Sequence, residues 1–259
     1  MGAERGRPRH RVEAGRSNRP PAAPSGPRIL AIETATRVMS VAILEGPRVV
    51  AELSTEGARV HSERLLPGID TVLAEAGLGL EDLDAIAVST GPGSFTGLRI
   101  AIATAKGLAF GAGPPLVGVS TLAALARAAR GAGGPVAALL DARRGELYAG
   151  VWSSADADTE PLVAESVYTP EGLSQLLPRG TRVVVGEDAS EGATALVAIS
   201  GPDLELLPAV DARAGRVGEL ALASLAAGGG QAAEALLPRY FRRAEAEVKR
   251  TGEALEPTL

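Results

Sequence analysis

The 259-residue chain contains no cysteine, and aromatic residues make up only 3% of it. Without thiols the chain forms no disulfide, offers no cysteine nucleophile and builds no thiolate metal site. No apolar run approaches the roughly 20 residues that span a bilayer, and the first residues lack the apolar stretch of a secretory signal. These absences predict a cytoplasmic protein with no membrane partner.

Histidine is also scarce, because His10 and His61 are the only two in the sequence. Transition-metal ions in proteins are usually held by clusters of histidine and cysteine side chains. The sequence also lacks a His-Glu-x-x-His motif, which argues against a zinc protease. We therefore expect no metal site.

The net charge of −5 hides an uneven distribution along the chain. Residues 1–28 hold seven arginines and two glutamates, which leaves the remainder of the chain at −10. Nucleic-acid binding requires basic patches and stacking rings, so this acidic, aromatic-poor remainder disfavours a self-sufficient RNA-binding module. Residues 1–27 lack apolar periodicity and are predicted to be a disordered tail rich in Arg and Pro. The tail is either an RNA-contacting arm or a dispensable extension.

Strand-like and helix-like patterns alternate from residue 28 onward. Apolar runs at 28–34, 38–44 and 48–53 predict three antiparallel strands. Apolar residues at helical spacing over 61–78 predict a helix, with Gly77 at its C-terminal end. A strand, a helix, a strand and a helix follow, over residues 83–90, 96–111, 115–119 and 120–130.

The pattern then restarts, which indicates an internal duplication. Residues 135–152 again predict a strand, a polar turn and a strand, and Glu33 and Asp141 end equivalent strands in the two halves. A short helix, a strand and a helix follow, over residues 169–178, 182–186 and 217–227. The sequence therefore predicts a duplicated α/β fold, with one lobe at 28–132 and a second at 133–259. The second lobe includes the C-terminal helix and tail, and both acid-tipped hairpins face a cleft between the lobes.

Five segments of the first 152 residues carry a family resemblance. They read ILAIETATRVMSVAIL, HSERLLPGIDTVLAEAGL, GPGSFTGLRIAIATAKGLAFG, PLVGVSTLAALA and LLDARRGELYAGVW, with LLPRYFRR as a late echo. Together they resemble the TsaB (YeaZ) family of the actin/Hsp70/sugar-kinase (ASKHA) superfamily. The resemblance implies a two-lobed ASKHA fold. It also implies a subunit that pairs with the catalytic paralogue TsaD, which attaches threonylcarbamoyl to tRNA adenosine with the ATPase subunit TsaE.

The first hairpin turn carries a candidate phosphate site in Glu33, Thr34 and Thr36. A hydroxyl can hold a phosphate oxygen, and a carboxylate can hold the water shell of Mg²⁺. The alternative is an ordinary turn in which the threonine hydroxyls bond the local backbone. TsaB relatives usually read Asp-Thr-Ser-Thr here, and Ala35 replaces their serine, which weakens the case for tight phosphate binding.

The stretch GPGSFTGLRI, residues 91–100, resembles a phosphate-binding turn. Gly91 and Gly93 permit a close backbone approach, and Ser94 can cap a helix whose N-terminus attracts anions. A P-loop would need a lysine at the helix start, and a dinucleotide fingerprint would need two residues, not three, between Gly93 and Gly97. A tight strand-to-helix turn is therefore favoured, and these three residues are kept as candidate phosphate contacts.

Asp141 is the remaining candidate phosphate contact, because in active superfamily members the second hairpin closes on phosphate. It lies two residues before Arg143, so an internally salt-bridged turn is the favoured alternative. TsaD-like catalytic chains also carry two metal-binding histidines four residues apart after a strand similar to residues 115–119. Thr121 and Leu125 stand at those positions here. The resemblance therefore implies that the catalytic centre is absent.

The helix at 96–111 is apolar on nearly every side except for Arg99 and Lys106. Such a helix usually buries one face on its own sheet and another against a neighbour, although burial wholly within one lobe fits the same pattern. The resemblance favours a partner, since TsaB-like proteins pair through this helix and the preceding one. The predicted interface consists of Leu65, Ile69, Leu73, Ile102 and Lys106.

The leading hypothesis is a dimerisation and scaffold subunit of the tRNA threonylcarbamoyl transferase complex, without catalysis by this chain alone. Its expected partners are a TsaD-like paralogue and a TsaE-like ATPase, with a homodimer left open and tRNA contacted only indirectly. No cofactor of its own is expected, and ATP or ADP is a candidate at the partner interface. The alternative is an independent small-molecule kinase or ATPase that uses Glu33 or Asp141.

Overall fold

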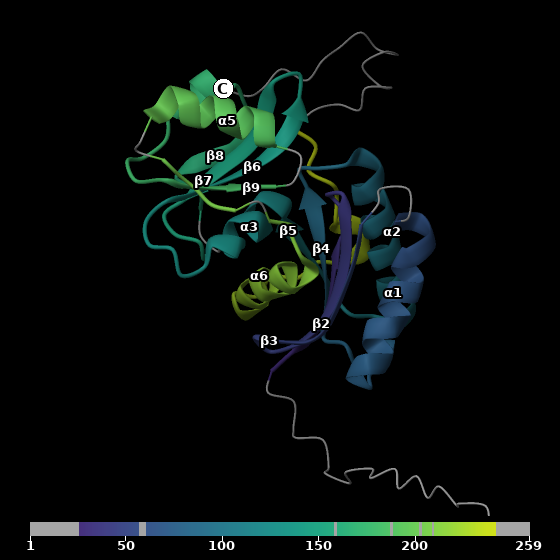
Figure 1. Ribbon diagram of the computed structural model, residues 1–259. Coiled ribbons are helices and arrows are strands. Elements are labelled where there is room, and N and C mark those ends of the chain that lie inside the picture. Colours follow the sequence, from purple (N-terminus) through teal and green to yellow (C-terminus); the bar gives the residue numbers. More distant parts are fainter. Residues whose placement is uncertain are drawn as a thin grey trace, which may run out of the picture.

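The computed structural model describes residues 26–56, 61–157, 160–186, 189–201, 204–208 and 210–241, and the predicted tail at 1–27 lies almost wholly outside them. The described residues form two five-stranded sheets, one in each half of the chain (Figure 1). No helix among them is long and apolar enough to cross a membrane.

The first sheet has the strand order β3-β2-β1-β4-β5. Its strands are β1 (Arg28–Glu33), β2 (Val38–Glu45), β3 (Arg48–Glu56), β4 (Ala85–Gly91) and β5 (Leu116–Ser120). β1, β2 and β3 pair antiparallel, whereas β1, β4 and β5 pair parallel. Both faces of β1 are buried: Leu30 and Ile32 belong to one hydrophobic cluster, and Ile29 and Ala31 to another. This two-sided burial accounts for the continuous apolar run in the sequence.

Helices α1 (His61–Ala76) and α2 (Phe95–Ala112) cover the outer face of the first sheet (Figure 1). Gly77 follows α1 with a φ of +68°, as its predicted place at the end of that helix requires. Ser94 caps α2, because its hydroxyl accepts a hydrogen bond from the Gly97 N–H at 3.2 Å. The side chains of both helices pack on Leu30, Ile32 and their neighbours.

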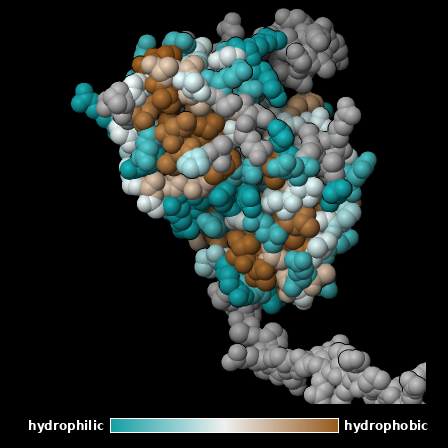
Figure 2. Space-filling model, viewed as in Figure 1, coloured by the Kyte–Doolittle hydropathy of each residue, from teal (hydrophilic) through white to brown (hydrophobic). Residues whose placement is uncertain are grey.

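The second sheet repeats the first, with the strand order β10-β9-β6-β7-β8. Its strands are β6 (Val136–Arg143), β7 (Glu146–Trp152), β8 (Val163–Tyr168), β9 (Arg182–Val185) and β10 (Glu205–Leu206). Helices α4 (Pro170–Ser174) and α5 (Ser190–Ser200) complete this lobe. The predicted duplicated α/β fold is confirmed, although the sequence patterns did not locate β8, α5 or β10. Figure 2 shows apolar surface on this lobe, which carries four exposed apolar side chains: Leu162, Leu176, Ile199 and Leu206.

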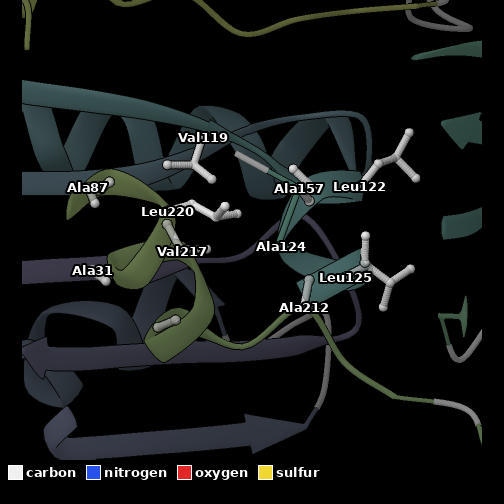
Figure 3. Packing of buried hydrophobic residues seen from close by; sticks show 14 of the residues in the cluster. Ala31, Ala87, Val119, Leu122, Ala124, Leu125, Ala157, Ala212, Val217 and Leu220 are labelled. Carbon is white, nitrogen blue, oxygen red and sulfur yellow. The ribbon is translucent and has the colours of Figure 1, made fainter. Parts of the chain in front are cut away.

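Two helices fill the space between the sheets, α3 (Thr121–Ala126) and α6 (Ala214–Ala226). Figure 3 shows Leu122 and Leu125 of α3 and Val217 and Leu220 of α6 in one hydrophobic cluster that also contains Ala31 of β1. Short 3-10 turns at Leu80–Asp82, Arg127–Ala129 and Ala233–Ala235 complete the helical elements described here.

Helix α6 belongs to the last third of the chain but packs against β1, β2 and β5 of the first sheet. Its first N–H groups are held by that sheet, since Ala214 donates to the Ser40 hydroxyl at 3.1 Å and Gly215 donates to Glu52 at 2.8 Å. A carboxylate at a helix N-terminus also interacts favourably with the helix dipole. The predicted division of the chain at residue 132 does not anticipate this return.

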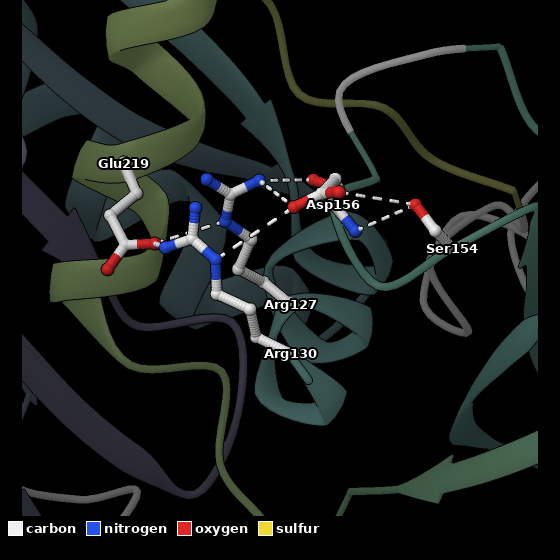
Figure 4. A network of polar contacts seen from close by, with 5 residues as sticks. All are labelled: Arg127, Arg130, Ser154, Asp156 and Glu219. Atoms are coloured by element: carbon white, nitrogen blue, oxygen red, sulfur yellow. Dashed lines mark hydrogen bonds and ion pairs between the residues drawn. The ribbon is translucent and has the colours of Figure 1, made fainter. Parts of the chain in front are cut away.

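A network of charged side chains joins the elements around α6 (Figure 4). Arg127, whose side chain is only 9% exposed, lies 3.0 Å from Glu219 of α6 and 3.6 Å from Asp156, which follows β7. Arg130 contacts the same two carboxylates from a more exposed position. The network therefore links α6 and the segment after β7 to the end of α3.

Candidate functional site

A cavity of about 260 Å³ lies between the two lobes. Thr36 from the first hairpin turn and Asp141 from the second both line it, as the sequence predicts for hairpin tips that face one cleft. Gly93 and Ser94, between β4 and α2, form another part of the wall. The remaining polar or charged lining residues are Arg37, Arg143, Tyr148 and Asp211.

Glu33 does not reach this cavity, although it was a predicted phosphate and Mg²⁺ contact. Its side chain is completely buried, and its carboxyl group accepts hydrogen bonds from the Ser89 hydroxyl and the Ala35 N–H. Burial raises the pKa of Glu33 to about 7, although the Ser89 hydrogen bond acts in the opposite direction. The structure therefore corrects the prediction: Glu33 joins the first hairpin turn to β4 inside the sheet.

The threonines of the first turn have different environments. Thr34 is fully buried, and its hydroxyl donates to the Gly97 carbonyl at 2.7 Å. A Cβ at Gly97 would overlap the Thr34 carbonyl oxygen, so the turn and α2 meet backbone to backbone. Thr36 is partly exposed in the cavity wall, and its hydroxyl donates to the Val38 carbonyl at 3.2 Å. Only Thr36 of this pair is placed to meet a bound molecule.

The glycines of the GPGSFTG stretch serve close packing. A Cβ at Gly93 would overlap the Ala35 carbonyl, which also accepts a hydrogen bond from the Ser94 N–H at 2.7 Å. Gly91 has a φ of +119°, and a Cβ there would lie 2.6 Å from the Arg239 carbonyl oxygen. Gly91 thus faces the C-terminal segment and is not among the cavity-lining residues. The arrangement is the tight strand-to-helix turn that the sequence favours.

Asp141 lies in the cavity wall, and its carboxylate is already engaged by its own turn. It accepts a hydrogen bond from the Arg143 N–H at 2.8 Å and lies 3.1 Å from the Arg143 guanidinium. Burial and the negative charge of Asp141 raise the pKa of Tyr148 across the hairpin. This is the internally salt-bridged turn that the sequence favours over a phosphate contact.

Sequence reasoning missed three polar residues of the cavity. Arg37 follows Thr36 in the first turn, so its neighbour was a signal that could have found it. Tyr148 lies within β7, which the sequence predicts only as an apolar strand, and no motif marks it. Asp211 lies in an irregular segment before α6, and no motif marks it.

The two positions that the family resemblance aligns with the histidines of TsaD-like chains are buried. Thr121 and Leu125 have no exposed surface. Leu125 belongs to the hydrophobic cluster that α3 shares with α6. Across the residues that the structure describes, no group of three or more His, Cys, Asp and Glu side chains could hold a metal ion.

The predicted interface residues need correction, because four of the five face the protein's own core. Leu65, Ile69, Leu73 and Ile102 are each at most 7% exposed and pack on the first sheet. Their side chains are therefore not available to a partner. Lys106 is partly exposed. The same two helices do carry exposed apolar side chains, Leu66 on α1 at 51% and Phe110 on α2 at 89%.

Comparisons with known proteins agree with the fold. The family model for TsaD, the tRNA N6-adenosine threonylcarbamoyltransferase, matches residues 49–249. The tRNA threonylcarbamoyladenosine biosynthesis protein TsaB of Escherichia coli (strain K12) is 40% identical over 167 residues, which cover 61% of this chain and 71% of that protein. TsaB of Bacillus subtilis (strain 168) is 32% identical over 228 residues, which cover 85% of this chain and 96% of that protein.

A solved structure also resembles the whole described fold. YeaZ from Pseudomonas aeruginosa superposes with a TM-score of 0.71 at 33% sequence identity, over 82% of this chain and 100% of that one. The sequence and structure comparisons therefore agree on one relationship across both lobes.

Proposed function

The chain belongs to the TsaB family, and from this premise we propose that it serves tRNA threonylcarbamoyladenosine biosynthesis as a non-catalytic subunit. Its role is to bind and support a TsaD-like catalytic chain. A TsaE-like ATPase is the further partner, and tRNA is contacted only through the complex.

The observation that carries this proposal is the burial of Thr121 and Leu125. A catalytic metal site needs ligands that reach an open position for water or substrate. These two residues stand where the TsaD-like histidines would be, and neither has exposed surface. Of the two acids that the sequence offers for kinase chemistry, Glu33 is likewise buried and bonded to Ser89, and Asp141 is paired with Arg143. Both features support delegation of the chemistry to the partner and disfavour an independent kinase.

The proposed partner surface is the outer face of α2. Successive residues of a helix advance by about 100°, so the exposed positions Arg99, Ala103, Gly107 and Phe110 share one side of it. Alanine and glycine allow a second helix to approach closely, and Phe110, 89% exposed, can enter a pocket on the partner. This surface replaces the buried residues that the sequence pattern suggested.

We place ATP or ADP at the interface with the partner and not in the interlobe cavity. The cavity volume of about 260 Å³ is below the ~300–1,000 Å³ typical of small-molecule sites. Asp141 and Arg143 in its wall are already paired with each other. A nucleotide at the partner interface could take contacts from both chains.

Reconstitution tests the proposal. The reaction contains tRNA, threonylcarbamoyl-adenylate, ATP, the TsaD-like chain and the TsaE-like ATPase, with or without this chain, and modified adenosine is measured in the tRNA. We expect product only when this chain and the TsaD-like chain are both present, and none from this chain alone. Equal product without this chain would refute the scaffold role, and product from this chain alone would make it an enzyme.

A further inference from the structure

After α6, which packs on the first sheet, the chain pairs with β5 and then crosses toward the second lobe. Gln231 exchanges two backbone hydrogen bonds of 2.9 Å with Leu116 of β5. Residues 236–241, which we call the strap, continue past the carboxyl ends of β5 and β4. The yellow end of the ribbon in Figure 1 marks this part of the chain.

The strap is anchored to the first lobe by its backbone and by two side chains. The Arg239 N–H donates to the Thr90 carbonyl of β4 at 2.7 Å, and Leu236 is 1% exposed in the core beneath α2. The Tyr240 ring lies 5.0 Å from the Phe95 ring in the first turn of α2. Arg99 donates to the Tyr240 hydroxyl at 3.1 Å.

The same segment is anchored to the second lobe. Arg239 Nη1 lies 2.8 Å from Glu165 Oε2 of β8, and the Glu165 side chain is only 6% exposed. The other Glu165 oxygen accepts a hydrogen bond from the hydroxyl of Ser120, the residue that caps α3. The Phe241 ring lies 6.1 Å from the ring of Tyr148, which lines the interlobe cavity.

The strap and its contacts contain more than half of the aromatic residues of the chain. The sequence has three Phe, three Tyr and one Trp, and the two ring pairs of the strap use four of these seven residues. A charge pair with a nearly buried carboxylate is costly to break once one partner is removed, and aromatic pairs add further stabilisation. These contacts join side chains of β8 and β7 to side chains of α2 through one short segment.

We propose that the strap fastens the second lobe to the first beside Tyr148 of the interlobe cavity and so sets how far the two lobes open. Domains that enclose a cleft open and close by rigid-body rotation about hinges, and the strap runs from Thr90 of the first lobe to Glu165 of the second. Its release lets the lobes separate and enlarges the cavity. The Tyr240 ring packs on Phe95, and the adjacent Phe241 ring contacts Tyr148 in the cavity wall. The strap therefore connects the first turn of α2 to the cavity.

Spin-label distances test the proposal directly, because the chain has no cysteine to compete for labelling. Glu75→Cys on α1 and Gln175→Cys after α4 place one label on an exposed position of each lobe. We expect Arg239→Ala and Tyr240→Ala each to move the distance distribution to longer and broader values. Arg179→Ala, an exposed arginine outside the strap, is the matched control and should leave the distribution unchanged. Distributions that stay unchanged in both strap variants would overturn the proposal.

Hydrogen exchange separates lobe opening from general loss of stability. In Arg239→Ala we expect the amides of the cavity turns, residues 35–37 and 142–145, to exchange about tenfold faster, with unchanged exchange in α1. Tyr240→Phe keeps the ring on Phe95 and should behave nearly as the unsubstituted chain. Faster exchange spread equally over α1 and the cavity turns would contradict a local fastening and overturn the proposal.

Discussion

The Ser89 hydroxyl of β4 donates a hydrogen bond to the Glu33 carboxyl at the end of β1, and neither side chain has any exposed surface. The two residues are 56 positions apart in sequence and are brought together by the parallel pairing of β1 and β4. Burying a protonated, hydrogen-bonded carboxyl group costs little free energy, whereas burying an ionised carboxylate costs much more.

The stability of the protein should therefore depend on the ionisation of Glu33. Its pKa is about 7 in the folded chain against 4.5 ordinarily, so the folded state holds the proton more tightly than the unfolded state. This contribution is fully present below pH 4.5 and is lost as the pH rises through about 7, a difference of about 3 kcal/mol in the free energy of unfolding.

Urea unfolding of Glu33→Gln at pH 5.5 and pH 8 measures this effect. The glutamine variant cannot ionise, so its stability relative to the unsubstituted chain should rise from pH 5.5 to pH 8. Glu75→Gln, which removes an exposed carboxylate from α1, is the control. The same relative stability of Glu33→Gln at both pH values would show that burial does not hold the proton there.

Two glycines of α2 should respond to alanine in opposite directions. A Cβ at Gly97 overlaps the Thr34 carbonyl oxygen, so Gly97→Ala should destabilise the protein by about 1–3 kcal/mol. Gly107 has no neighbour within 4 Å of the new Cβ, and Gly107→Ala should stabilise the protein by about 0.5–1 kcal/mol through helix propensity. Thermal unfolding of the two variants checks the pair, and equal effects would contradict the close approach of α2 to the first turn.

Arg127→Ala should cost about 2–3 kcal/mol of stability, because it removes the more buried of the two guanidinium groups that contact Glu219 of α6 and leaves only the exposed Arg130 at 3.2 Å. Arg48→Ala is the matched control, since Arg48 is 69% exposed and pairs with Glu45 within one hairpin. That surface pair should contribute less than about 1 kcal/mol. Similar midpoints in chemical unfolding for the two variants would mean that the network of Figure 4 adds no more than a surface pair.

Phe110→Asp should weaken binding of the TsaD-like partner about 100-fold, because it places a charge where an aromatic anchor is proposed. The fold should persist, since Phe110 is 89% exposed in the free chain. Leu162→Asp alters an exposed apolar residue of the other lobe and should bind the partner normally. Calorimetric titration of both variants is the measurement, and undiminished binding by Phe110→Asp would exclude this face of α2.

The alternating and continuous apolar runs predicted most of the strands, because strand periodicity depends on the burial of local side chains. β8 escaped prediction because its central Glu165 reads as a surface residue. Its burial depends on Ser120 and Arg239, which lie far away in the sequence.

The candidate site was harder to predict for the same reason. An acid at a strand end, such as Glu33, has the same local pattern whether it points into a cleft or into the sheet, and only the position of Ser89 decides. The predicted interface residue Ile102 lies in the core instead, and the sequence did not reveal this because α2 is apolar on nearly every side. Periodicity then cannot separate the face on the sheet from the face toward solvent, and Ile102 and Phe110 look alike in sequence.

Helix α6 closes the inner face of the first sheet, yet it is synthesised after all five strands of the second sheet. During synthesis, Ala31, Ala42 and Leu44 are made early and obtain their covering helix only after Ala214 has emerged. A fragment cut after residue 132 would lack that cover and expose apolar surface to water. The first lobe is therefore begun first and finished last, and a fragment that ends before α6 leaves this face of its sheet uncovered.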